Sequence, residues 1–321
     1  MNILFVFGNG LDINLGLKNS YQDFYDYYLD RPSSSPLIEK LKDHLKKERY
    51  GQWSDLELGL GRYTEEVDSV EDLEVIYHDL DDNLQSYLKV SVTSFSIDDS
   101  LRNNFIRDLN TSYRGLPGVA SQEVNYYLRQ KPNHNINIMT FNYTNVVEKI
   151  LYFKIPNKTF PLSISQFSSV NSVQHIHMTL NHSDIIMGVN DESQIKNNTL
   201  ICSECKGLMI KPYINQRLGM RVDSECMYNI NNADYICLFG LSLGETDNIW
   251  WKAIGERMRT SSARLVLYYY DKDIITYNNR LILKMDYCRD LLMRRMDIKN
   301  MPSDLPNRIY IGYKADIFSG K

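Results

Sequence analysis

The sequence predicts an α/β fold, in which a mainly parallel β-sheet is flanked by helices and a helical insertion follows the first strand–helix unit. Short apolar runs without strict alternation recur along the chain, which is typical of strands buried on both faces. Helical segments follow several of these runs, as expected when parallel strands are joined by helices. With 321 residues, of which 43% are hydrophobic and 24% charged, the chain is expected to form one α/β domain over residues 1–321.

Seven segments carry strand signals, and two helical segments directly follow such strands. Because the carboxyl ends of parallel strands lie at one edge of a sheet, the turns after them are expected to share a crevice, the usual ligand site of this fold. The expected helices cover 145–153 and 248–259. The expected strands cover 3–7, 136–141, 173–177, 184–187, 235–239, 264–270 and 308–313.

Residues from about 33 to 130 differ from the rest of the chain. They contain long charged, amphipathic segments such as LIEKLKDHLKKERY and VEDLEVIYHDLDDNLQSYL, and no clear strand. We predict a helical insertion between the first and second strands of the sheet. In that position it can cover the crevice at the carboxyl ends of the strands.

Charge and composition argue against several classes of protein. The net charge is -4, and basic residues do not alternate densely with aromatic ones, so nucleic acid is disfavoured as a partner. The apolar run 3–7 is too short for a signal peptide or a membrane span, so a cytoplasmic protein without a membrane partner is expected. The five cysteines form no disulfide framework and are expected to be reduced.

The opening turn GNGLDINLG is the first candidate site. Gly8, Asn9 and Gly10 join a strand to a short helix, where backbone N–H groups favour a phosphate. Asp12 is expected to face a ribose hydroxyl, a water or the helix start, because a carboxylate repels phosphate. The glycine spacing does not match the dinucleotide fingerprint G-x-G-x-x-G. A plain strand–turn–helix therefore has equal weight at this point.

Two further segments place polar residues at strand ends. In TFNYTN, Asn142 and Thr144 are expected to point into the crevice, and the alternative is that they form a turn and a helix N-cap. In VQHIHMTL, alternation puts His175 and His177 on one face of a strand. A metal site is disfavoured, because the sequence offers no third ligand with suitable spacing. One of the two histidines is therefore a candidate general base. The alternative is a buried histidine bonded to backbone carbonyls.

The last candidate turn is FGLSLGETD, which again joins a strand to a helix. Gly240, Ser242 and Gly244 can offer N–H and hydroxyl groups to a phosphate or ribose, and Asp247 stands where a helix N-cap is expected. The alternative is a capped, tightly packed turn.

Together these segments resemble the bacteriophage abortive-infection AbiH family. The resemblance spans residue 3 to about residue 251, and it implies a role in phage defence with a phage-derived trigger. The motifs that carry it are GNGLDINLGL with SYQDF, the W-x-D-x-E of Trp53, Asp55 and Glu57, TFNYT, HIH followed by IIMG, and FGLSLGETD.

The AbiH family is in turn similar to sirtuin-type NAD-binding domains, which implies a Rossmann-like (sirtuin-like) sheet and NAD as substrate or ligand. The residues that correspond are Gly8 and Gly10 in the glycine-rich turn, Asn142 beside the nicotinamide ribose, His177 as base, and Gly240 with Ser242 in the later ribose and phosphate turn.

The chain departs from these families at several positions. Met178 follows His177 where both families favour glycine and could narrow the space above the histidine, Thr144 replaces a sirtuin aspartate, and Leu241 stands where AbiH relatives commonly have histidine. The pair Cys202 and Cys205 has no second pair at zinc-module spacing, so neither a zinc site nor deacetylase activity is expected.

The leading hypothesis is a phage-defence enzyme that hydrolyses the nicotinamide–ribosyl bond of NAD, without a metal. One alternative is a non-catalytic nucleotide sensor. Another is a metal-dependent nuclease using Asp12, Asp55, Glu57 and Asp247. A homo-oligomer is compatible with the sequence. The candidate catalytic residues are His177, Asn142 and Asp12, and the candidate nucleotide-binding residues are Gly8, Asn9, Gly10, Thr144, Gly240, Ser242 and Asp247.

Overall fold

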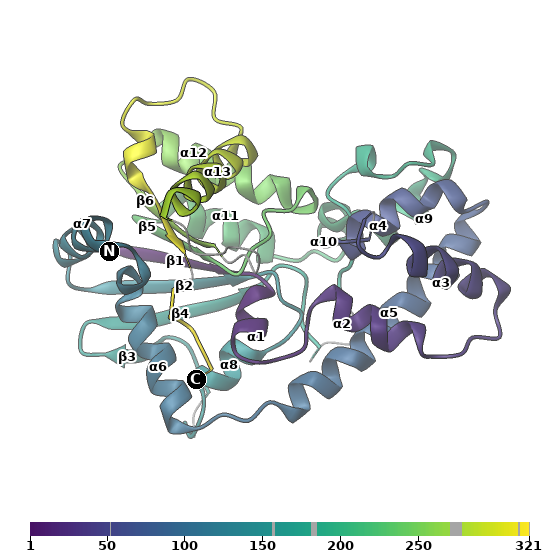
Figure 1. Cartoon of the computed structure of the whole chain (residues 1–321), viewed down its shortest axis with the longest axis horizontal. Coiled ribbons are helices and arrows are strands. Elements are labelled where there is room, and N and C mark those ends of the chain that lie inside the picture. Colours follow the sequence, from purple (N-terminus) through teal and green to yellow (C-terminus); the bar gives the residue numbers. More distant parts are fainter. Residues whose placement is uncertain (52, 156–157, 181–184, 270–277, 314, 321) are drawn as a thin grey trace.

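A seven-stranded sheet with strand order β3-β4-β2-β1-β5-β6-β7 forms the centre of the molecule (Figure 1). The structure is a computed structural model that describes residues 1–51, 53–155, 158–180, 185–269, 278–313 and 315–320. All neighbouring strands are parallel except β3 and β4, so the predicted mainly parallel α/β fold is confirmed. The strands are β1 (Asn2–Phe7), β2 (His134–Thr140), β3 (Leu162–Ser165), β4 (Ser168–His175), β5 (Tyr235–Phe239), β6 (Arg264–Tyr269) and β7 (Ile309–Tyr313).

The central strand β1 is buried on both faces, as its apolar run predicts. Phe5 and Phe7 belong to a core that includes residues of α6 (Asp99–Asn110), α7 (Gly118–Arg129) and α8 (Val146–Leu151). Leu4 and Val6 belong to a second core with α11 (Val222–Asn232), α12 (Asn248–Thr260) and α13 (Asn278–Met296). Figure 1 shows these two sets of helices on opposite sides of the sheet. Burial of successive side chains on both faces is the reason for the apolar sequence of the strand.

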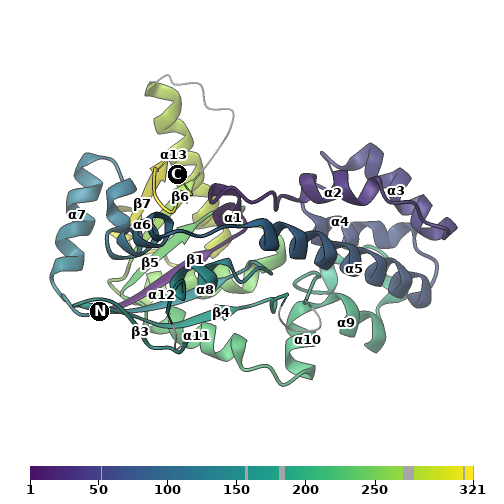
Figure 2. The ribbon, with the colours of Figure 1, turned by 90° about the horizontal axis from the view of Figure 1, so that it is seen from below.

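A second group of helices lies beside the sheet, and we call it the helical body (Figures 1 and 2). It has its own core, which includes Tyr25, Trp53, Leu80 and Met209. No described helix of the chain is long and apolar enough to cross a membrane. The helical body consists of α2 (Tyr21–Leu29), α3 (Pro36–Glu48), α4 (Leu56–Tyr63), α5 (Val70–Ser94), α9 (Ser203–Met209) and α10 (Lys211–Arg217).

The segment expected to be a helical insertion contains helices and no strand among its described residues. In space it is divided. Its first helices belong to the helical body, whereas α6 and α7 return to cover the sheet. The helical body also contains α2, which precedes residue 33, and α9 and α10, which follow β4, so its bounds differ from the expected insertion at about 33–130.

Some boundaries differ from the sequence-based expectation. Residues 185–187 form no strand, and residue 184 lies outside the described residues, as does residue 270 of the strand expected at 264–270. Ile185 and Met187 are buried in the core of the helical body instead. A short buried apolar run gives the same sequence signal whether or not it forms a strand. The strand expected at 173–177 begins at Ser168 and ends at His175. The antiparallel edge strand β3 and helix α13 were not predicted.

Candidate active site

A cavity of about 560 Å³ lies between the carboxyl ends of the strands and the helical body. This volume is within the range of small-molecule sites in proteins. The turns after β1, β2 and β5 contribute its polar wall, as expected for an open parallel sheet. All of the candidate site residues predicted from the sequence line this cavity: Gly8, Asn9, Gly10, Asp12, Asn142, Thr144, His177, Gly240, Ser242 and Asp247.

The glycines after β1 and β5 pack against each other. The Gly8 N–H donates to Phe239 O at 3.0 Å, and the Gly10 N–H donates to Gly240 O at 2.9 Å. A Cβ atom on Gly10 would lie 2.5 Å from the Gly240 Cα atom, and Gly240 has φ of +70°. The glycines are therefore required by the close approach of two turns. Contrary to expectation, the N–H groups of Gly8 and Gly10 are engaged in backbone hydrogen bonds and are not free phosphate donors.

Asp12 is buried among three hydrogen-bond donors. Its Oδ2 accepts from Asn19 Nδ2 at 2.8 Å and from Thr144 Oγ1 at 2.5 Å, and its Oδ1 accepts from Asn142 Nδ2 at 2.9 Å. Burial raises the pKa of Asp12 and outweighs these hydrogen bonds, which lower it. The carboxylate therefore holds side chains of two neighbouring turns together, which differs from the expected contact with a ribose, a water or the helix start.

The Asn142 side chain has one polar atom that forms a hydrogen bond and one that does not. Because its Nδ2 donates to Asp12, its Oδ1 points the other way from the amide carbon. This buried Oδ1 has no hydrogen-bond partner among the described residues. Neither Asn142 nor Thr144 caps α8, whose N-cap is Asn145. The alternative of a turn with an N-cap is thus wrong for these two side chains.

The two histidines near the end of β4 have different surroundings. His175 Nδ1 lies 3.0 Å from Asn142 O and its Nε2 lies 2.7 Å from Glu148 Oε1. Burial lowers the pKa of His175, but Glu148 and the Asn142 carbonyl raise it by more. His175 is thus the satisfied buried histidine. His177 lies beyond the strand, and its buried Nδ1 has no hydrogen-bond partner among the described residues.

His177 contacts a cluster of buried charges at its other nitrogen. Its Nε2 lies 3.3 Å from Asp247 Oδ1 and 3.5 Å from Lys211 Nζ. Burial alone would raise the pKa of Asp247, but Lys211 and then His177 lower it to about 2. Asp247 occupies the expected N-cap position of α12, yet its side chain caps no backbone N–H.

Lys211, the first residue of α10, was missed by sequence reasoning. Its Nζ donates to Glu57 Oε2 at 2.8 Å and to Asp247 Oδ1 at 3.0 Å. Glu57 Oε1 accepts from Tyr143 OH at 2.9 Å and from the Gly188 N–H at 3.3 Å. Burial lowers the pKa of Lys211, but the two carboxylates raise it above its usual value. The available signal was a lysine directly after the apolar run 208–210.

The four carboxylates considered for a metal-dependent nuclease do not share one site, because their side chains have different contacts. Asp12 holds amide and hydroxyl groups, whereas Glu57 and Asp247 share the Lys211 ammonium. Asp55 caps α4 by accepting from the N–H groups of Glu57 and Leu58, each at 3.0 Å. Within the described parts of the chain, no group of three or more His, Cys, Asp or Glu side chains is arranged to hold a metal ion.

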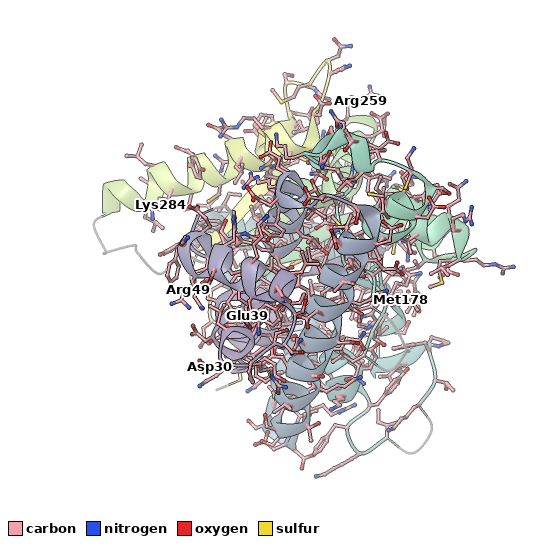
Figure 3. All side chains as sticks on the ribbon, turned by 90° about the vertical axis from the view of Figure 1, so that its right-hand side faces the viewer. Asp30, Glu39, Arg49, Met178, Arg259 and Lys284 are labelled. Carbon is pink, nitrogen blue, oxygen red and sulfur yellow. The ribbon has the colours of Figure 1, made fainter. Side chains whose placement is uncertain are left out.

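Met178 and Leu241, two of the departures from the family pattern, have different positions. Leu241 lines the cavity. Met178 is not among the described residues that line it, so its side chain does not narrow this space. Its backbone has φ of +62°, a left-handed conformation that glycine adopts more easily. Figure 3, in which Met178 is labelled, shows the molecule with the helical body in front.

A known protein family matches most of this sequence. Its sequence model, described as Bacteriophage abortive infection AbiH, matches residues 4–269. The matched region runs from β1 to β6 and includes all the described residues that line the cavity. Among curated proteins, no relative matches the chain.

Proposed function

The chain belongs to the bacteriophage abortive infection AbiH family, which gives it a role in phage defence, and we propose that it acts by hydrolysing an NAD-type nucleotide in the cavity. The bond broken is the one between nicotinamide and ribose. His177 and Asn142 are the proposed catalytic residues, and loss of cellular NAD is the proposed cause of abortive infection.

The observation that carries this proposal is that two residues lining one cavity each have a buried polar atom without a hydrogen-bond partner. His177 Nδ1 and Asn142 Oδ1 are both buried, and neither has a hydrogen-bond partner among the described residues. A buried polar atom without a partner costs roughly 1–3 kcal/mol. A ligand or water that forms hydrogen bonds with both atoms would remove this cost.

The composition of the cavity wall supports a nucleotide. The strand ends supply polar groups, which suit a sugar and phosphates, whereas the helical body supplies apolar and aromatic side chains, which suit a planar base. The apolar wall consists of Tyr21 and Phe24 from α2 and Leu84, Tyr87 and Leu88 from α5.

In the proposed reaction, each residue has a defined task. Asn142 Oδ1 accepts a hydrogen bond from the attacking water or a ribose hydroxyl, and Asp12 holds the Asn142 amide in the required orientation. His177 is the base that accepts a proton from the water. The water oxygen bonds to ribose C1′ while the bond from C1′ to the nicotinamide nitrogen breaks, and its electron pair leaves with nicotinamide. NAD supplies a leaving group that already carries positive charge.

The test is release of nicotinamide from NAD by purified protein, followed by chromatography, together with the NAD content of phage-infected cells that express it. We expect His177→Ala to remain folded and to lose at least about 100-fold in rate, because general base catalysis contributes about 10²–10⁴-fold. His78→Ala is the matched control, because His78 is exposed on α5.

Other outcomes would favour the alternatives. Binding of NAD without turnover, even in infected cells, would contradict hydrolysis and favour a nucleotide sensor. Metal-dependent cleavage of nucleic acid would favour a nuclease. An unchanged rate in His177→Ala would remove His177 from the mechanism.

A further inference from the structure

Part of the cavity wall is formed where the start of α4 faces the turn after β5, and we call it the Gly244 recess. Asp55 is the N-cap of α4, whereas Ser242, Gly244 and Thr246 follow β5. All four residues line the cavity. A Cβ atom added to Gly244 would lie 3.4 Å from Asp55 Oδ2. It would lie 3.6 Å from both Ser242 Oγ and Thr246 Oγ1. Three side-chain oxygens therefore surround the side of Gly244 that carries no side chain.

Packing within the protein does not require a glycine at position 244. Its φ is -61°, which any residue adopts, and a Cβ atom there would make only ordinary van der Waals contacts. At Gly10 and Gly240, by contrast, a Cβ atom would lie 2.5 Å from a backbone atom of the facing turn. The missing side chain of Gly244 therefore leaves space in the cavity that a ligand can occupy.

The two carboxylate oxygens of Asp55 have different surroundings. Oδ1 accepts from the N–H groups of Glu57 and Leu58, each at 3.0 Å, and is held by the first turn of α4. Oδ2 has no hydrogen-bond partner among the described residues, and Asp55 is partly exposed. The Lys211 ammonium donates to Glu57 and Asp247 instead. Asp55 Oδ2 is thus an acceptor that is available to a ligand in the cavity.

The charge of Asp55 favours a neutral donor group over a phosphate. Burial, and then the charge of Glu57, raise the pKa of Asp55 to about 6, so its carboxylate is ionised at pH 7.5 and only accepts hydrogen bonds. A phosphate beside Oδ2 would be repelled. A sugar hydroxyl can donate to Oδ2 and also bond the hydroxyls of Ser242 and Thr246, which both donate and accept.

The Gly244 recess lies beside the proposed catalytic histidine. Asp247 directly follows Thr246 in the chain, and its Oδ1 lies 3.3 Å from His177 Nε2. In NAD, the ribose that carries nicotinamide is the sugar at the bond to be broken. A hydroxyl in the recess is therefore expected to belong to this ribose.

We propose that Asp55 is a specificity-determining residue whose Oδ2 accepts a hydrogen bond from a hydroxyl of the ribose that carries nicotinamide, and that Gly244 leaves the space for this sugar. This rests on the proposed nucleotide ligand and names the part of it that enters the recess. The recess accepts a ribosyl unit with a free hydroxyl at this position and rejects one that carries a phosphate there. Asp55 of the W-x-D-x-E motif thus has a second task besides capping α4.

The test measures binding by isothermal titration calorimetry at pH 7.5. ADP-ribose keeps the ribose from which nicotinamide has left, whereas ADP lacks it. Asp55→Asn retains a capping oxygen but places an NH2 group at the other position, so we expect ADP-ribose to bind about 10- to 100-fold more weakly. Gly244→Ala fills the recess and is expected to weaken ADP-ribose binding by about 10-fold or more. Neither variant is expected to weaken the binding of ADP.

Gly207→Ala is the matched control, because a Cβ atom at this position of α9 would have no atom within 4 Å beyond its own part of the helix. It is expected to bind both probes as the native protein does. If Asp55→Asn does not fold, as judged by circular dichroism, Gly244→Ala decides the test. Unfolding of both variants would make the recess purely structural and would overturn the proposal.

Two binding results would also overturn the proposal. Unchanged or tighter binding of ADP-ribose in Asp55→Asn would show that Oδ2 accepts no ligand hydroxyl, and tighter binding would place a phosphate beside it. Equal weakening of ADP-ribose and ADP in the variants would show a general structural effect.

Release of nicotinamide from NAD, measured separately, distinguishes this proposal from the proposed function. If the native protein binds ADP-ribose but releases no nicotinamide, the proposed function fails and the role of Asp55 stands. If nicotinamide is released but Asp55→Asn binds ADP-ribose as the native protein does, the role of Asp55 fails and the proposed function stands. Native protein that binds neither ADP-ribose nor NAD would overturn both.

Discussion

Asp12 and Asp247 are both carboxylates in short helical segments after central strands, but the protein compensates their burial differently. Asp12 accepts hydrogen bonds from three neutral side chains, and burial still raises its pKa. Asp247 contacts the Lys211 ammonium at 3.0 Å, and its pKa is lowered to about 2 despite burial. Neutral donors thus orient a carboxylate, whereas a buried cation determines its charge.

This difference separates the tasks of the two sides of the cavity. Around Asp12, directed hydrogen bonds fix the Asn142 amide between two turns of the sheet. Around Asp247, charges from the helical body reach the His177 ring. Changes at the first set are expected to alter geometry, whereas changes at the second are expected to alter protonation.

The largest effect is expected from removing the cation. In Lys211→Met, Glu57 and Asp247 remain buried without a counter-charge, so we expect the free energy of unfolding to fall by about 3–5 kcal/mol. Urea denaturation measures this change. Lys206→Met removes an exposed ion pair and should change stability by less than about 1 kcal/mol. Equal losses in both variants would contradict the distinction between the two carboxylates.

A smaller effect is expected at the hydrogen-bonded carboxylate. Asp12→Asn keeps the shape of the side chain but replaces one carboxylate oxygen by an NH2 group, which cannot accept the hydrogen bonds that Asn19 and Thr144 donate. We therefore expect the free energy of unfolding, measured by urea denaturation, to fall by about 1–3 kcal/mol. The rate of NAD cleavage should fall as well, because Asp12 no longer holds the Asn142 amide in its orientation. Asp30→Asn, at an exposed position labelled in Figure 3, is the control.

Asp55 is a third carboxylate that lines the cavity, and Lys211 affects its pKa only through charge at a distance. Burial and Glu57 raise its pKa to about 6, against the Leu58 N–H and Lys211, which lower it. A raised carboxyl pKa contributes stability that is present below pH 4 and lost as pH rises through 6. Asp55→Asn retains a capping side chain but has no carboxyl group to titrate. Between pH 4 and 6.5, the free energy of unfolding of the native protein should therefore fall by roughly 1–2 kcal/mol more than that of Asp55→Asn.

Urea denaturation at several pH values measures the Asp55 effect. The contribution of Asp247 has the opposite sign and another window, since its lowered pKa gives stability that is lost as pH falls from about 4 towards 2. A parallel pH dependence of the native protein and Asp55→Asn would show that Asp55 is not titrating in this range.

The smallest effect is expected outside both carboxylate sets. Met178 has a left-handed backbone, so Met178→Gly should be about 1 kcal/mol more stable than Met178→Ala, which removes the side chain but keeps the strain. Thermal denaturation of the two variants measures the difference. NAD cleavage should be retained in Met178→Gly, because Met178 is not among the described residues that line the cavity.

The sequence by itself determined the sheet, the order of its strand-end turns and the residues of the polar wall. Apolar runs such as that of β1 predict strands buried on both faces, and parallel strands bring their carboxyl ends to one edge, which is why Gly10, Asn142 and Gly240 meet. The apolar pattern wrongly predicted a strand at 185–187. Ile185 and Met187 are buried by the helical body and not by neighbouring strands.

Only the tertiary structure decided what these residues contact. The turn glycines face each other rather than open space, and His175 is satisfied where His177 is not. Lys211 pairs with Glu57 across 154 positions of the chain, because α4 and α10 pack within one helical body. A repeating pattern of apolar residues reports which faces are buried, but the pairing of charges depends on distances between elements that such a pattern does not contain.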